Sequence, residues 1–437
     1  MTRILFTTMP MAGHLRPGLP IAQQLVADGH EVAWYTGAKY APLVTRAGAE
    51  AFPMGAHLDF DDAEVDGVIG AEPDRKPGLR TLKRAILELF IGPIPAWVSE
   101  IDAVIDTFRP DVVVAEQGFM AGPIAAERRG IPRVVFNVSP LGISSVDAAP
   151  FGTGLLPSSS ALGRLRNRSL NWAIRNVVFA ECQRAAEQVR ERLGLPPVDA
   201  YFMDWGADIA DRYLVPSVPE FEYPRRDLPD TVEFVGPFLT QRVDEWTPPA
   251  WWDDVLAAKA SGRPVVLVTQ GTLATDPANL VLPSVAGLAS SDALVIATTS
   301  GYDPDEVLPV GDRPANARLV EFIPFTELLP LVDVMVTNGG YGGVQMALAH
   351  GVPLVVAGLT EDKMEVSGRV TWSGTGIALK TDTPSAEQVR RGVATVLGSQ
   401  GYRQRARALQ SVYAGWPGAT RAAEAILEVA TVPAPAV

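Results

Sequence analysis

The sequence predicts an α/β protein built from two domains, each with a parallel sheet. The chain has 437 residues, more than one ordinary hydrophobic core accommodates, so two or three domains are expected. Short apolar runs recur along it, and each is followed by a turn and a helical pattern, which is the order of βαβ units. A new series of such runs starts at residues 265–268, which indicates a second sheet.

The first βαβ unit begins at the N-terminus. We expect a strand at residues 4–6, a loop at 9–17, an amphipathic helix at 19–28 and a second strand at 31–35. The loop lacks the GxGxxG pattern of a dinucleotide fingerprint, and no acidic residue ends the second strand to hold an NAD ribose. A dehydrogenase is therefore disfavoured.

Two polar side chains in this half are candidates for chemistry. His14 lies in the loop after the first strand, where a lone histidine is most often a surface or capping residue. Glu116 ends a predicted strand at residues 111–116 and precedes a helix expected from about Ala121. Glu116 is either a partner for another polar group or a capping, solvated residue.

The region between these strands is the part of this half that is expected to meet a substrate. Residues 59–77 read as an acidic loop, residues 79–90 as amphipathic and residues 91–98 as apolar with two prolines. The Arg-rich helical stretch at 158–194 reads as a solvated face. Four apolar side chains follow strand ends or lie in loops on the same side, and they line a substrate cleft or belong to the core: Phe119, Phe136, Leu141 and Phe151.

The predicted domain boundaries follow the Pro- and charge-rich stretch after residue 215. We expect an N-terminal domain at 1–215, a linker at 216–249, a C-terminal domain at 250–415, and a final helix with a tail at 416–437.

The most informative stretch is a glycine-rich turn after a predicted strand at residues 334–336. Asn338-Gly339-Gly340-Tyr341-Gly342-Gly343 leads into a helix that ends before Gly351 and Pro353. Such a turn points backbone N–H groups outward at the positive end of a helix dipole, which suits a phosphate or diphosphate. A tight strand–helix turn without a ligand is the alternative.

A second turn, at residues 358–363, follows the next predicted strand and carries Glu361, Asp362 and Lys363. In open parallel sheets, ligands bind at the carboxyl ends of the strands. Two neighbouring turns of this kind could hold a diphosphate in one and a many-hydroxyl group in the other, which is the pattern of a nucleotide-sugar pocket.

This stretch resembles the donor-binding motif of the family 1 glycosyltransferases, which use UDP- or TDP-sugars and have the GT-B fold of two facing Rossmann-like domains. The resemblance covers nearly the whole chain. The matching positions are Gly339, Gly340, Gly342, Ala347, Leu348, Gly351, Val352, Pro353, Asp362, Arg369, Val370, Gly374 and Gly376.

Three positions depart from the family pattern. Asn338 replaces a phosphate-contacting His, and its amide can donate a hydrogen bond but carries no charge. Met346 replaces a Glu that holds the ribose hydroxyls. Lys363 replaces a Gln beside Asp362 and adds a cation next to the sugar or the diphosphate.

For catalysis, the resemblance implies that His14 is the general base that deprotonates the acceptor. Imidazole suits the task because its unperturbed pKa, about 6.5, leaves it mostly neutral at working pH. The family usually has Asp where Glu116 stands, and this carboxylate would orient the imidazole. No metal is implied, because the helix N-terminus takes over the stabilisation of the leaving group. Acidic patches at residues 59–61 and 303–305 read as solvated.

For the donor, the resemblance implies contacts from several segments. The turn with Gly271 and Thr272 resembles the family's first diphosphate-side loop, and Phe322 with the backbone of Ile323 would hold the base. Asp362 would bind sugar hydroxyls, with Lys363 beside it. The full set of expected donor residues is Gly271, Thr272, Phe322, Ile323, Asn338, Gly339, Gly340, Gly342, Gly343, Gln345, Asp362 and Lys363.

The resemblance thus implies an inverting glycosyltransferase that moves a sugar from a UDP or TDP donor to a hydroxyl of an apolar small molecule such as a polyketide, macrolide or flavonoid. The final helix is expected to cross back onto the N-terminal domain, and the protein to be a monomer or homodimer. A nucleotide-sugar epimerase or hydrolase on the same scaffold, or a non-catalytic nucleotide-sugar-binding protein, are the alternatives.

Composition excludes several other classes. A net charge of −13 argues against nucleic acid or an anionic membrane as a partner. Cys182 is the only cysteine, so disulfides within the chain and cysteine-based metal sites are excluded. The chain begins without a basic and apolar leader, and no apolar run approaches the ~20 residues of a membrane span. We expect a soluble, cytoplasmic protein.

Overall fold

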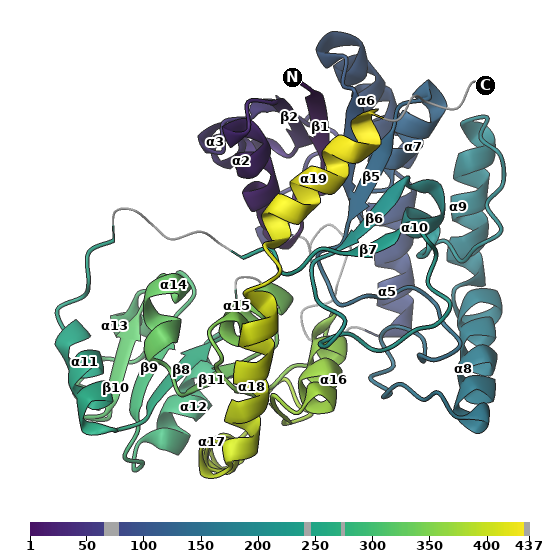
Figure 1. The fold of residues 1–437 in the computed structure, drawn as a ribbon. Helices are drawn as coiled ribbons and strands as arrows, with labels where there is room; N and C mark the ends of the chain where they lie inside the picture. Colours follow the sequence, from purple (N-terminus) through teal and green to yellow (C-terminus); the bar gives the residue numbers. More distant parts are fainter. Residues whose placement is uncertain (65–77, 240–245, 272–275, 432–437) are drawn as a thin grey trace.

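A computed structural model describes residues 1–64, 78–239, 246–271 and 276–431. Two parallel sheets lie side by side, each covered by helices (Figure 1). The first sheet has the strand order β3-β2-β1-β4-β5-β6-β7 within the described residues. Its strands are β1 (Arg3–Thr7), β2 (Glu31–Thr36), β3 (Glu50–Pro53), β4 (Val112–Glu116), β5 (Arg133–Phe136), β6 (Arg212–Val215) and β7 (Val232–Phe234).

Helices cover both faces of this sheet because its central strands are apolar on both sides. The α-helices of this half are α1 (Ala12–Leu15), α2 (Leu19–Ala27), α3 (Ala41–Arg46), α5 (Leu79–Ala85), α6 (Ile94–Phe108), α7 (Ala121–Arg129), α8 (Ala161–Ala173), α9 (Ala180–Arg192) and α10 (Trp205–Ile209). Wider π-helical turns, Ile86–Ile91 and Ile174–Val178, extend α5 and α8. Short 3₁₀ turns lie at Arg16–Gly18, Ala38–Tyr40 and Asp62–Glu64.

The second sheet has the order β10-β9-β8-β11-β12-β13 in the described part of the chain. Its strands are β8 (Val265–Thr269), β9 (Leu294–Thr298), β10 (Ala317–Val320), β11 (Val334–Thr337), β12 (Leu354–Val356) and β13 (Gly376–Ala378). Its helices are α11 (Trp252–Ser261), α12 (Val281–Leu288), α13 (Pro304–Val307), α14 (Phe325–Leu328), α15 (Tyr341–Ala349), α16 (Lys363–Ser373), α17 (Ala386–Gly398) and α18 (Gln400–Tyr413), with 3₁₀ turns at Val310–Asp312 and Leu329–Leu331.

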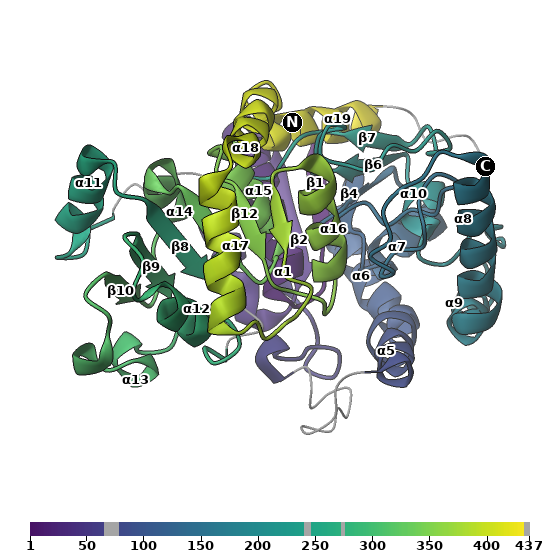
Figure 2. The same ribbon diagram turned by 90° about the horizontal axis from the view of Figure 1, so that it is seen from below.

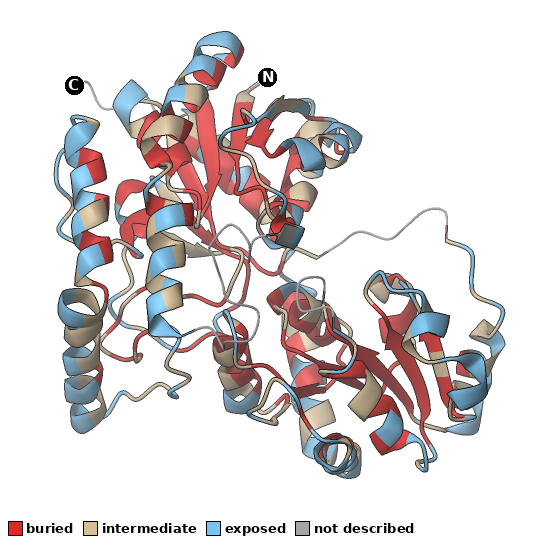
Figure 3. Cartoon of the chain, turned by 180° about the vertical axis from the view of Figure 1, so that it is seen from behind, coloured by how far each residue is buried: buried red, intermediate tan, exposed pale blue. Residues whose placement is uncertain are grey.

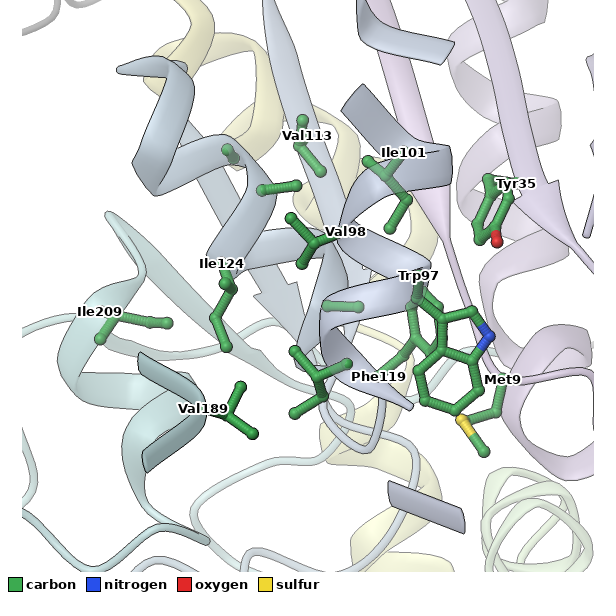
Figure 4. Close-up of a cluster of buried hydrophobic side chains, with 14 of the residues drawn as sticks. Met9, Tyr35, Trp97, Val98, Ile101, Val113, Phe119, Ile124, Val189 and Ile209 are labelled. Atoms are coloured by element: carbon green, nitrogen blue, oxygen red, sulfur yellow. The ribbon is translucent and has the colours of Figure 1, made fainter. Parts of the chain in front are cut away.

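Both sheets are buried between helix layers (Figure 3), and separate apolar clusters fill the two faces of each sheet. In the N-terminal half, α6 packs its apolar face on the sheet, and Trp97 lies against Phe119 with ring centroids 5.0 Å apart (Figure 4). A separate cluster fills the second half around β8 and β11. The two-sheet α/β prediction is confirmed.

The last helix, α19 (Gly418–Thr431), leaves the second half and packs on the first (Figure 1). Ala422, Ile426 and Val429 are buried in the cluster that contains Phe6 of β1 and Val114 of β4. The expected crossover of the final helix is confirmed, and it joins the two halves through apolar burial.

Several local expectations need correction. The segment 9–17 is not an open loop, because it folds into α1 and a 3₁₀ turn. The expected linker 216–249 contains β7, which pairs in parallel with β6 and completes the N-terminal sheet. Isolated short strands such as β6 and β7 carry too weak a pattern to be seen in the sequence.

The four apolar residues considered for a substrate cleft differ in how deeply they are buried. Phe119, Phe136 and Leu141 are fully buried in the core, so the cleft interpretation is wrong for them. Phe151 is partly buried and packs close to Gly142, where a Cβ would lie 3.0 Å from its ring. Within the described residues, no helix is long and apolar enough to cross a membrane.

Candidate active site

The expected site residues gather at the topological switch point of each sheet. In the first sheet β1 lies between β2 and β4, and in the second β8 lies between β9 and β11. At such a point the connections leave in opposite directions and open a space beyond the carboxyl ends of the strands, where ligands bind in open α/β sheets. His14 follows β1 and Glu116 ends β4, while Gly271 follows β8 and Asn338 follows β11.

His14 and Glu116 are brought together as expected. His14 Nδ1 lies 2.8 Å from Glu116 Oε2, within hydrogen-bond distance. The Glu116 side chain is fully buried, whereas the His14 side chain is 23% exposed. Glu116 Oε1 accepts a hydrogen bond from the Gly118 backbone N–H at 2.5 Å. The interpretation of Glu116 as a solvated residue is wrong, and the extra methylene of Glu relative to Asp does not prevent the contact.

Gly118 allows this pair to form. A Cβ at Gly118 would lie 2.9 Å from Glu116 Oε1 and 3.2 Å from His14 Cε1. Any larger residue would push the carboxylate or the imidazole away, so the turn after β4 requires glycine for reasons of space.

The environment of His14 makes it a stronger base than a free imidazole. Burial alone would lower its pKa, but the charge of Glu116 and the hydrogen bond with it raise the pKa above the usual 6.5. Asp362 and Asp62 add to this effect. The Phe90 ring lies 6.5 Å from the His14 imidazole, measured between ring centroids.

Asp362 lies on the opposing domain and interacts electrostatically with His14. Burial and the neighbouring Glu361 raise the pKa of Asp362 to about 6, while Lys363 and His14 oppose this shift. Lys363 is buried, with Nζ 3.0 Å from Glu361 Oε2, and it is the first residue of α16. The two domains thus bring the imidazole and a carboxylate of the donor motif into range of each other.

The two glycine turns are in direct contact. Gly339 has φ +92°, a left-handed conformation that favours glycine, and Gly340 precedes the first turn of α15. A Cβ on Gly358 would lie 2.0 Å from the Asn338 carbonyl oxygen, so only glycine lets the turns approach. Gly342 is exposed with no neighbour within 4 Å of a Cβ, and a Cβ on Gly343 would meet Met335 at 3.5 Å.

Asn338 has a contact that sequence reasoning missed. Its side-chain amide donates to the Gln270 carbonyl and accepts from the Gly340 N–H at 3.3 Å. It therefore joins the turn after β8 to the turn after β11. Gly271 lies beside it with φ +81°, and a Cβ there would be 3.4 Å from the Asn338 amide. Thr272 lies outside the described residues.

Phe322 and Ile323 have opposite environments. Phe322 is 73% exposed, so its ring does not belong to the core and is free to stack on a planar ligand. Ile323 is 1% exposed, so only its backbone is available to a ligand. Phe325 is partly buried and packs against the core cluster of the second domain.

Gln345 and Met346 are engaged inside the protein. The Gln345 side chain is buried, donates to the Pro216 carbonyl at 2.8 Å and accepts from the Tyr413 hydroxyl. These contacts place the Gln345 side chain between the linker and α18, and the expected role of Gln345 in donor binding stays a prediction. Met346 is buried in the core of the second domain, which explains why an apolar residue stands where the family has Glu.

A buried charged network between the domains was not foreseen. Arg369 of α16 is fully buried, donates to Glu222 Oε2 at 2.8 Å and to the Leu141 carbonyl at 2.9 Å. Glu365, on the same helix, accepts from the backbone N–H of Gly152 at 2.8 Å. Arg369 matches the family motif, which is a signal of importance, but nothing local in the sequence identifies its partners.

The acidic patches differ from expectation in part. Asp59 accepts from the backbone N–H of Ala38 at 2.9 Å, so it holds a turn and is not simply solvated. Asp61 is exposed and pairs with Lys39 at 2.6 Å. Asp303 caps α13 by accepting from the Asp305 N–H. In the part of the chain that the structure describes, no group of three or more His, Cys, Asp or Glu side chains is arranged to hold a metal ion.

The architecture and the arrangement of the site define the class of protein. Two Rossmann-like domains make up the GT-B fold of glycosyltransferases, and here one carries an imidazole–carboxylate pair and the other glycine turns at its switch point. The family model "Glycosyl transferase 4-like domain" matches residues 19–202, and "Erythromycin biosynthesis protein CIII-like, C-terminal domain" matches residues 283–429.

Known relatives agree over almost the full length. The chain is 44% identical over 94% of its length to 4'-demethylrebeccamycin synthase of Lentzea aerocolonigenes, covering 96% of that protein. It is 33% identical over 94% of its length to UDP-glycosyltransferase 2 of Phaeomoniella chlamydospora, covering 92% of it. The solved structure of CalG4, the calicheamicin glycosyltransferase, superposes over both full chains with a TM-score of 0.74 at 22% identity. The chain belongs to the family 1 glycosyltransferases and is a glycosyltransferase.

Proposed function

We propose that the protein is an inverting glycosyltransferase that transfers a sugar from UDP or TDP to a hydroxyl of an apolar small molecule. The names of its relatives support the substrate classes. One is named for the formation of 4'-demethylrebeccamycin, another for a UDP-linked donor, and the family model for erythromycin biosynthesis. The acceptor we propose is a polyketide, macrolide or flavonoid, a choice that rests on the family resemblance.

One observation carries the catalytic part of the proposal. His14 Nδ1 lies 2.8 Å from the buried carboxylate of Glu116, so the imidazole is held with its other nitrogen available. His14 Nε2 accepts the proton from the acceptor hydroxyl while Glu116 stabilises the imidazolium that forms. The pKa of His14, raised by Glu116, lies closer to that of a phenol or alcohol, which increases the driving force for proton removal.

The second domain would stabilise the leaving group. The acceptor oxygen forms a bond to the anomeric carbon as the bond from that carbon to the diphosphate breaks, and the electron pair goes to the diphosphate oxygen. Backbone N–H groups at Gly342 and Gly343, in the first turn of α15, face the developing charge at the positive end of the helix dipole. No metal ion is required in this proposal, and attack opposite the diphosphate inverts the configuration.

The remaining donor contacts follow from exposure and charge. The exposed Phe322 ring would stack on the base, and the carboxylate of Asp362 would accept from the sugar hydroxyls. Asp362 suits this role because it lies at the N-terminus of α16 and within electrostatic range of His14. A sugar held there places its anomeric carbon between the base and the glycine turn.

The first test identifies the donor. In a thermal-shift panel of UDP-, TDP- and GDP-sugars, the true donor should raise the melting temperature. The free energy of unfolding should increase by about RT ln(1 + [L]/Kd). The donor that binds is then offered with phenols, flavonoids and macrolides, including acceptors that carry only a ring N–H. Donor consumption without an acceptor would favour a hydrolase or epimerase, and binding without turnover on any acceptor would favour a non-catalytic protein.

The second test concerns the base. His14→Ala should lower kcat by roughly 10²–10⁴-fold, the usual loss for a general base, while the thermal shift with donor is retained. His57→Ala is the matched control, because His57 is 72% exposed. Undiminished turnover of the His14→Ala variant would overturn the assignment of the base.

A further inference from the structure

The short helix that carries His14 begins without a cap of its own. The residue before α1 is Met11, whose side chain makes no hydrogen bond to the helix, so the first N–H groups of α1 need another partner. The Ala12 N–H finds one 50 residues further along the chain, where Asp62 Oδ2 accepts it at 2.9 Å.

Asp62 is built into this position by several contacts. Its carboxylate is 5% exposed and accepts from the Tyr40 hydroxyl at 2.5 Å and from Lys39 Nζ at 2.6 Å. Burial would raise the pKa of Asp62, but the hydrogen bonds from Lys39, Tyr40 and Ala12 hold it below its usual range. The side chain is therefore an anion at neutral pH.

The contact with Ala12 reaches the base through a rigid turn. The His14 N–H donates to the Met11 carbonyl at 3.0 Å, and Leu15, which follows His14, is fully buried in the core. The turn from Met11 to Leu15 is thus held at one end by Asp62 and at the other by apolar packing. His14 projects from the middle of this turn towards Glu116.

We propose that Asp62 is a positioning residue for the catalytic base: it caps α1 from a distant segment and so sets the place of the His14 imidazole. This proposal rests on the assignment of His14 as the base. Asp62 acts through α1 and touches no substrate, so its removal changes the rate of the chemical step and leaves donor binding unchanged.

The charges around both groups determine what a titration should show. Glu116, Asp362 and Asp62 face His14, and all three raise its pKa. The groups around Asp62 are Lys39, Tyr40 and Asp61. The charge of Arg16 lowers the pKa of Tyr40. Removing the charge of Asp62 should lower the pKa of His14, by less than removing the charge of Glu116.

Two substitutions separate the contact from the charge. Asp62→Asn keeps an oxygen that can accept from the Ala12 N–H but loses the charge. Asp62→Ala loses both. Asp61→Ala is the matched control, since Asp61 binds the same Lys39, is about half exposed and makes no contact with α1.

The first readout needs no substrate. The chain has four histidines, so imidazole signals of histidine-labelled protein can be followed by NMR and the His14 signal assigned from its loss in His14→Gln. The pKa of His14 should fall in Asp62→Asn and Asp62→Ala and stay at the wild-type value in Asp61→Ala. A His14 titration in Asp62→Ala that matches the wild type would overturn the proposal, because this variant loses the contact with Ala12, and this outcome is independent of whether the proposed reaction is correct.

The second readout is kinetic, with the donor and acceptor found by the panel. Asp62→Ala should lose roughly 10- to 100-fold in kcat, as expected for a misplaced catalytic group, with the KM for the donor unchanged. Asp62→Asn should retain most of kcat with its acid limb moved to lower pH. Equal kcat values for Asp62→Ala and Asp61→Ala would contradict a positioning role. If Asp62→Ala does not fold, Asp62→Ser, whose side chain is too short to reach the Ala12 N–H, replaces it in both readouts.

Discussion

At the scale of single residues, the pair His14–Glu116 would set the pH range of the proposed reaction. The base must be neutral to accept a proton, and its pKa is raised above 6.5 in spite of its burial. The rate should therefore rise with pH through an acid limb whose midpoint lies above 6.5. This direction is opposite to that of a buried histidine without a carboxylate, such as His350, whose pKa burial lowers.

Glu116→Gln tests this interpretation. Without the carboxylate, burial dominates and the pKa of His14 falls, so the acid limb of kcat should move to lower pH. We also expect kcat to drop by roughly 10²-fold or more, because the imidazolium loses its partner. Glu100→Gln serves as the control, because the Glu100 carboxylate lies beside His57 and not beside His14. An acid limb that stays at the wild-type pH in Glu116→Gln would contradict the role of Glu116. The measurement is a pH profile of kcat.

At the scale of elements, the two glycine turns after β11 and β12 act as one unit. The Asn338 carbonyl lies where a Cβ of Gly358 would be, and Asn338 also joins these turns to the end of β8. Each turn is a local feature, but the binding surface for a diphosphate depends on their close approach. The glycines of these turns are of two kinds: Gly358 is required by packing, whereas Gly342 has open space around it, where the proposed diphosphate would bind.

Substituting one glycine of each kind separates these requirements. Gly358→Ala should lower the melting temperature, because its Cβ would overlap the Asn338 carbonyl oxygen and force the turns apart. Gly342→Ala should leave the melting temperature of the free protein unchanged or slightly raised, since its Cβ meets nothing and Ala favours a helix. It should nevertheless abolish most of the thermal shift with donor. A full donor shift in Gly342→Ala would argue against the diphosphate site.

At the scale of the whole molecule, the interface between the domains is held by charge as well as by apolar burial. Arg369 and Glu365 of α16 bind backbone groups of the N-terminal domain, and α16 lies on the side of the second domain that faces the first (Figure 2). The same helix begins with Asp362 and Lys363. The geometry of the donor motif relative to His14 is thus fixed by contacts along α16.

Arg369→Met should destabilise the protein by about 3 kcal/mol or more, because it leaves the buried carboxylate of Glu222 without its closest partner. Arg225 lies 3.7 Å from Glu222 and compensates only in part. Arg391→Met is the control, since Arg391 is exposed on α17 and is expected to change stability by less than about 0.5 kcal/mol. Thermal melting of both variants provides the measurement. Equal melting temperatures would show that the network adds nothing to stability.

Much of the fold followed from the sequence alone. The apolar runs of β1, β4, β8 and β11 are strong local signals, and the glycine turns after them mark where helices start. The pairing of His14 with Glu116 was expected from the family resemblance, and the parallel pairing of β1 with β4 places the two residues at neighbouring strand ends. Such predictions succeed because strand periodicity, turn chemistry and right-handed crossover connections restrict the possible topologies.

Only the tertiary structure decided the contacts between distant segments. Arg369 and Glu222 are 147 positions apart, Gln345 and Pro216 are 129 apart, and Asp62 caps α1 from 50 residues away. Whether an amide or a carboxylate faces a ligand or another segment depends on which surfaces pack, and no local pattern encodes that choice. The sequence determined the strands, the turns and the chemistry at their ends. Packing between elements determined which of those side chains remain available to a substrate.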